Sequence, residues 1–114
     1  MDNYDSLTKG AKVTLLKLYK NYLDKIDSGA DRELAKQFGG SDDIKKNIIK
    51  DESISNIDSY CHELSDQKLL DITVADDLVY ISSLTNLAIN IMENRFARNA
   101  AKVLNAIVKI GSVI

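Results

Sequence analysis

The stretch Leu69–Thr85 constrains the fold more than any other part of the chain, because it has the pattern of a β-hairpin. In its first arm apolar residues alternate with other residues at the period of a strand, with Leu70, Ile72 and Val74 set between Asp71, Thr73 and Ala75. The second arm, LVYIS, is rich in strand-favouring residues, and Asp76-Asp77 between the arms tolerates a tight turn. An isolated hairpin is only marginally stable in water, so this one must pack on helices.

The sequence before the hairpin supplies such helices. A first helix begins near Leu7, carries apolar residues at steps of three and four, and ends at Ser28-Gly29. DRELAKQF predicts a short second helix, capped by Asp31 and closed by Gly39-Gly40.

Two further segments have helical spacing before the hairpin, and one has it after. Residues 41–52 are mostly polar, but their Ile spacing, with Ser41 as a cap, favours one or two helical turns. Ser53 or Ser55 caps the next helix, whose apolar positions recur at the helical period: Ile54, Ile57, Cys61 and Leu64. Thr85 caps a final helical region from Asn86 onward.

Composition agrees with one mostly helical domain. The chain has 114 residues, 45% apolar and 28% charged, with a net charge of −2 and no Pro to interrupt a helix. A single Cys excludes an internal disulfide and fits a reducing compartment, and MDNYDSLTKG is unlike a secretory signal. No apolar run approaches the roughly 20 residues of a membrane span. We therefore expect a cytoplasmic protein.

The order of these elements resembles the winged helix-turn-helix superfamily. The segments that carry the resemblance are RELAKQF as the second helix, IDSYCHELSDQKLL as the third helix entering the first wing strand, and YISSLT as the second wing strand. A more distant likeness is to the small YjcQ-like bacterial and prophage proteins. The resemblance implies a mainly α fold with a small two- or three-stranded antiparallel β-wing, followed by a C-terminal helix. The resemblance covers roughly Leu7 to Met92, so we assign residues 1–92 to a winged-helix domain. Residues 93–114 have an apolar pattern of their own, and we assign them to an amphipathic C-terminal helix.

One feature departs from the family pattern. The spacer from Gly39 to Glu52 is longer than the tight turn between the second and third helices of a standard motif. Either an extra helix is inserted there, or the second helix of the motif is one element further along the chain.

The resemblance implies a regulator-like protein that binds DNA, with the third helix in the major groove and the wing on the phosphates. The residues then expected to face the bases are Ser55, Asn56, Ser59 and His62, and those expected to contact phosphates are Lys45, Lys46 and Lys50. The local charge opposes this docking, because residues 53–77 hold one Lys against six acids, a net charge of −5. The alternative is a protein-interaction module of winged-helix fold that binds no DNA.

The C-terminal segment NRFARNAAKVLNAIVKIGSVI has a heptad-like seam. We expect it to form a homodimer interface whose residues are Phe96, Ala100, Val103, Leu104, Ile107, Ile110 and Ile114. A second interpretation is that this helix folds back over its own core. A third is adsorption to an anionic membrane surface, but the small Ala residues at the seam favour contact between helices instead.

The sequence offers no convincing catalytic or metal-binding set. Cys61 and His62 are the one thiol–imidazole neighbourhood, and adjacent residues of a helix point about 100° apart, too far to act as nucleophile and base. A zinc site needs three or four ligands, which one Cys and one His do not supply. We expect a protein that is not an enzyme and needs no cofactor.

Overall fold

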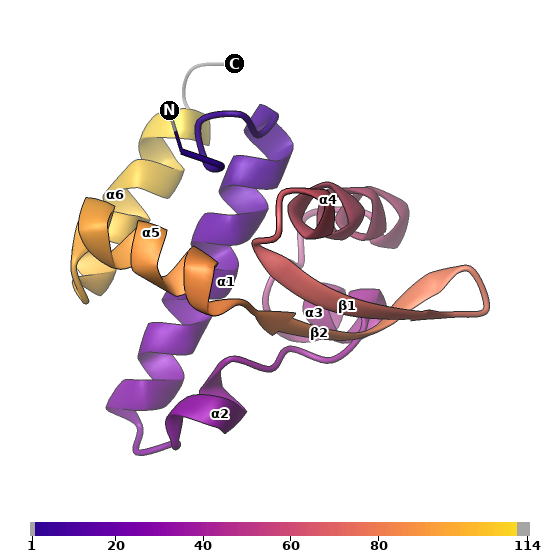
Figure 1. Cartoon of the computed structure of the whole chain (residues 1–114), viewed down its shortest axis with the longest axis horizontal. Helices are drawn as coiled ribbons and strands as arrows, with labels where there is room; N and C mark the ends of the chain where they lie inside the picture. Colours follow the sequence, from indigo (N-terminus) through magenta and orange to yellow (C-terminus); the bar gives the residue numbers. More distant parts are fainter. Residues whose placement is uncertain (1, 112–114) are drawn as a thin grey trace.

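A computed structural model describes residues 2–111 of the chain (Figure 1). Within that range the protein is mainly helical with a two-stranded antiparallel sheet, as the sequence predicts. The long helix α1 (Lys9–Asp27) runs through the middle of the molecule. On one side of it lie the helices α5 (Asn86–Phe96) and α6 (Ala100–Gly111) (Figure 1). On the other side lie α3 (Ser41–Asn47), α4 (Ile54–Asp66) and the hairpin.

Helix α1 forms because one face is apolar and both of its ends are capped. Thr8 Oγ1 accepts a hydrogen bond from Ala11 N at the N-terminus, and the helix stops before Gly29, whose φ is +98°. The Glu63 carboxylate of α4 accepts bonds from both Thr8 N and Thr8 Oγ1, each at 2.7 Å. The buried face of α1 forms the centre of the core, through Leu15, Leu16, Leu18, Tyr19, Tyr22 and Leu23.

Helix α2 (Arg32–Ala35) is shorter than predicted. Asp31 caps it as expected, by accepting a bond from Leu34 N at 3.0 Å. The prediction that the helix continues through Phe38 is wrong, because the chain there pairs with the hairpin. Phe38 N donates to Ser82 O at 3.1 Å, and Leu84 N donates to Lys36 O at 2.9 Å. Pairing with a strand far along the sequence has overridden local helix propensity.

The predicted helical turns in residues 41–52 are present as α3 (Ser41–Asn47). Gly40, not Ser41, is the N-cap, and its N–H donates to the Asp43 carboxylate at 3.0 Å. Helix α4 (Ile54–Asp66) follows after a short turn. Ser53 is its cap, with Oγ accepting from Asn56 N at 3.1 Å.

The predicted hairpin consists of β1 (Leu70–Ala75) and β2 (Leu78–Leu84). Asp76 and Asp77 form the two-residue turn with φ values of 53° and 66°, as a type I′ turn requires. The register shifts once, because Thr73 pairs with Ile81 while Val74 pairs with Val79. Tyr80 is therefore an unpaired bulge residue in β2.

The predicted helix over residues 93–114 is divided within the described range. Helix α5 (Asn86–Phe96), capped by Thr85, ends before Ala97, whose φ of 52° and ψ of −147° are not helical. Tyr19 of α1 donates its hydroxyl to Ala97 O at 2.7 Å and so holds the bend in place. Helix α6 (Ala100–Gly111) then runs back along α1.

Candidate functional site

Asp58 of α4 joins three elements on the side of the molecule that carries the hairpin. Its Oδ1 accepts hydrogen bonds from Ser41 Oγ of α3 and from Val79 N of β2, each at 2.7 Å. Its side chain is 14% exposed, and His62 Nε2 lies 3.5 Å from Oδ2. This carboxylate fixes the hairpin against the two helices, so α4 and the hairpin lie next to each other.

The residues predicted to face DNA bases all lie on the exposed side of α4. Ser55, Asn56, Ser59 and His62 are exposed, while Ile57 and Cys61 between them face the core. Asn56 Nδ2 donates to Glu52 Oε1 at 2.8 Å, so the amide is already held from within the chain. The structure thus brings the four side chains together on one helix face.

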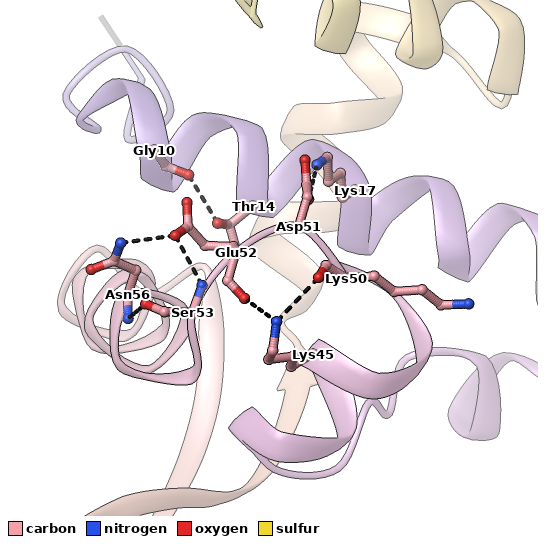
Figure 2. A network of polar contacts seen from close by, with 9 residues as sticks. All are labelled: Gly10, Thr14, Lys17, Lys45, Lys50, Asp51, Glu52, Ser53 and Asn56. Carbon is pink, nitrogen blue, oxygen red and sulfur yellow. Dashed lines mark hydrogen bonds and ion pairs between the residues drawn. The ribbon is translucent and has the colours of Figure 1, made fainter.

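Of the three lysines predicted to contact phosphates, two are exposed and one is hydrogen-bonded within the chain. Lys46 and Lys50 are exposed, but the Lys45 ammonium donates to Lys50 O at 3.1 Å and to Glu52 O at 2.7 Å. Figure 2 shows this ammonium between the two carbonyls, and the Lys50 side chain pointing away from the network. Lys45 therefore stabilises the turn between α3 and α4.

The Glu52 carboxylate organises the same turn. Its Oε1 accepts from Asn56 Nδ2 and, at 3.0 Å, from Ser53 N (Figure 2). These hydrogen bonds, the one from Asn56 first, hold the pKa of Glu52 below its usual value. A negative charge at the N-terminus of α4 also interacts favourably with the helix dipole, and it opposes the approach of a phosphate there.

Exposed apolar side chains gather on the hairpin, and sequence reasoning missed them. The side chains concerned are exposed by 43% to 64%, namely Val74, Leu78, Tyr80 and Ile81. Four consecutive apolar residues, from Leu78 to Ile81, were the available signal. They put apolar groups on both faces of β2, and the helices of this fold cover one face.

The segment that bears these side chains is strongly acidic. From residue 54 to residue 94 the sequence contains one basic residue besides His62, Lys68, against seven acids: Asp58, Glu63, Asp66, Asp71, Asp76, Asp77 and Glu93. Asp71, Asp76 and Asp77 are exposed on the hairpin itself. The α4–hairpin face is defined as the exposed residues of α4, β1, β2 and the turn between the strands. It therefore combines apolar side chains with a net negative charge.

The predicted dimer seam lies largely inside the molecule. Val103 is fully buried, and four other seam residues are partly buried against the core: Phe96, Ala100, Ile107 and Ile110. Leu104 remains 46% exposed, and Ile114 lies outside the described residues. This placement corresponds to the second interpretation of the C-terminal segment, a helix folded over its own core.

A hollow of about 590 Å³ lies between α1, the α3–α4 turn and the end of α6. Three of its four charged lining residues are already engaged, since Lys17 pairs with Asp51 at 3.5 Å and Glu52 binds Ser53 and Asn56; the fourth is Lys9. Among residues 2–111, no three His, Cys, Asp or Glu side chains form a group that could hold a metal ion. None of the described helices has the length and apolarity needed to cross a membrane.

Comparison of the chain with protein-family models, with curated proteins and with solved structures found no match.

Proposed function

We propose that the chain is a winged helix-turn-helix protein in which α3 and α4 form the helix-turn-helix and the hairpin is the wing. The order of elements supports this, since α1, the strand-like residues 36–38, α3, α4, β1 and β2 follow one another as in that superfamily. In this assignment the second helix of the motif is α3, one element beyond the segment RELAKQF. Helix α2 is then an insertion between the first helix and the first strand.

We propose further that the protein is a binding module without catalytic activity, and that it binds another protein through the α4–hairpin face. The observation that carries this proposal is the number of half-exposed apolar side chains on the acidic hairpin, with Val74 on one face and Leu78 and Ile81 on the other, and with Tyr80 at the bulge. Apolar groups gathered on a surface are typical of a docking site for protein. The surrounding carboxylates repel a phosphate backbone, whose neutralisation by Lys and Arg supplies most non-specific affinity for DNA.

DNA binding is the second candidate. The observation in its favour is that Ser55, Asn56, Ser59 and His62 lie together on the exposed face of α4, where a recognition helix presents its side chains. Lys46 and Lys50 are exposed on the preceding elements and are then the phosphate contacts. We no longer include Lys45 among the phosphate contacts, because its ammonium is hydrogen-bonded to two backbone carbonyls.

A photo-crosslinking amino acid placed at Tyr80 tests the protein-binding proposal in cells that carry the gene. The matched control is the same amino acid at Leu34 of α2, because the two positions are similarly exposed, at 64% and 60%. Helix α2 lies away from the tip of the hairpin (Figure 1). We expect a discrete protein adduct from position 80 and none from position 34.

A titration with mixed-sequence duplex DNA at low salt tests the alternative. We expect no binding, because the α4–hairpin face carries a net negative charge. Two results together would establish DNA binding in place of protein binding. One is salt-dependent DNA binding that is lost in Asn56→Ala, and the other is the absence of an adduct at position 80.

A further inference from the structure

The two edges of the hairpin differ in what covers them. The outer edge of β2 is occupied, because Val79 N donates to Asp58, Ser82 O accepts from Phe38 N, and Leu84 N donates to Lys36 O. Gly40 backs directly onto this edge, since a Cβ there would lie 2.7 Å from Val79 O. Other segments of the chain therefore cover this edge of the hairpin.

The outer edge of β1 is open. In an antiparallel ladder, two residues directly opposite each other both direct their N–H and C=O groups inward or both direct them outward. The backbone groups of Ser82 and Val79 point outward, away from β1. Their partners Ile72 and Val74 therefore direct their own backbone groups outward, away from β2. No backbone hydrogen bond links another described segment to β1 between Asp71 and Ala75. This edge offers unpaired donors and acceptors at every second residue.

The side chains beside the open edge define what would pair with it. Val74 is 47% exposed on one face of the hairpin, and Ile81 and Leu78 are exposed on the other. The charged residues of the hairpin itself are all negative, with Asp71 on the strand and Asp76 and Asp77 at the turn. A complementary strand would carry apolar residues alternating with Lys or Arg.

We propose that β1 binds an extended, basic segment of a partner protein as an additional strand of the sheet. This inference rests on the proposed protein-binding function and names the chemistry of the partner. Backbone hydrogen bonds to Ile72 and Val74 hold the segment, while the carboxylates select its charge. A second copy of β1 is a poor occupant, because it brings the same carboxylates to a surface that is already negative.

Direct binding of a labelled model peptide tests the proposal. The probe is a peptide of alternating Val and Lys, as long as β1, and its binding is followed by fluorescence anisotropy. The matched peptide has the same sequence with N-methyl groups on alternate residues, which removes backbone donors and keeps the charge. We expect the N-methylated peptide to bind at least about tenfold more weakly than its parent.

Paired variants of the protein test the same edge. Val74→Pro removes one outward N–H, at a strand edge where Pro is tolerated, and Val74→Ala removes most of the same side chain but keeps the N–H. We expect the Pro variant to bind the probe about tenfold more weakly than the Ala variant. Asp76→Asn with Asp77→Asn keeps residues that accept positive φ and should weaken binding through lost charge alone. Urea unfolding of each variant shows whether the hairpin still folds.

Two results would overturn the inference. One is the absence of saturable binding of the Val–Lys peptide up to about 1 mM. The other is binding that responds to the Asp→Asn changes but not to N-methylation or to Val74→Pro, which would indicate simple charge attraction. In either case an adduct at position 80 would leave the proposed function standing, whereas its absence would remove both.

Discussion

At the scale of single residues, Asp58 links α4 to both α3 and β2, which its place in the sequence does not reveal. Its carboxylate is mostly buried and binds Ser41 Oγ and Val79 N, which belong to elements on either side of α4 in the sequence. We expect Asp58→Ala to lower the free energy of unfolding by about 2–4 kcal/mol, because both donors lose a charged acceptor. Urea denaturation measures this change.

The control for Asp58 is the exposed Asp66 of the same helix. Asp66→Ala should change the free energy of unfolding by no more than about 0.5 kcal/mol. Equal effects of the two substitutions would mean that the link between α3, α4 and β2 contributes little to stability.

The thiol of Cys61 should be unreactive in the folded protein. Burial raises its pKa to about 12, with the nearby Asp58 charge adding to the effect, and thiolate is the reactive form. We expect a thiol reagent near pH 8 to label the native protein at least about a hundredfold more slowly than the protein in urea. Ala101→Cys in a Cys61→Ala background places a thiol on the exposed side of α6 and should react at once. Fast labelling of native Cys61 would contradict its burial.

At the scale of elements, the predicted dimer seam divides into core and surface positions. Val103→Ala should cost about 2 kcal/mol of stability, since Val103 is fully buried against the rest of the chain. Leu104→Ala should cost no more than about 0.5 kcal/mol, because Leu104 is 46% exposed. Thermal or urea unfolding of the two variants compares them directly, and a reversed order would mean that α6 is rotated.

The turn between α3 and α4 should show a defined pH dependence. Because the folded pKa of Glu52 is lowered, its ionised form stabilises the native state above the unfolded value of about 4.5, and this contribution is lost as the pH falls through the folded pKa. Glu52→Gln should therefore lower the urea midpoint near pH 7 and have no effect near pH 3. The same loss at both pH values would assign the effect to packing instead of charge.

How far the sequence predicts these elements depends on whether the signal is local. The caps Asp31, Ser53 and Thr85 and the Asp76-Asp77 turn are local features, and all are found where the pattern places them. The early end of α2 and the bend at Ala97 depend on partners far along the chain, Ser82 and Tyr19. No window of sequence around either position contains that information.

The residues of the candidate site could also be predicted only where the signal is local. The exposed face of α4 follows from helical periodicity, so Ser55, Asn56, Ser59 and His62 are located correctly on it. The engagement of Lys45 with the carbonyls of Lys50 and Glu52 required the path of the turn. The open edge of β1 required knowledge of which segments cover β2.

At the scale of the whole molecule, homodimerisation stays a prediction, and the structure narrows the surface available for it. The exposed apolar residues of α6 are spaced by three and four positions along one stripe: Ala101, Leu104 and Val108. A stable interface buries about 800 Å² on each partner, more than such a stripe provides, so we expect weak association. The mass measured by light scattering should rise from monomer toward dimer as concentration increases.

Leu104→Asp should hold that mass at the monomer value, while Leu34→Asp on α2 should leave the rise unchanged. A dimer that survives Leu104→Asp would place the interface on another surface.

The packing of α6 along α1 has a consequence for how the chain folds during its synthesis. Helix α1 leaves the ribosome with an apolar side that α6 will cover only after α2, α3, α4, the hairpin and α5 have followed. Until then the nascent chain exposes that side, and closing so long a loop also slows the search for the native arrangement. We therefore expect nascent chains that end before Val103 to bind chaperones, and chains that include α6 to bind them no longer after release.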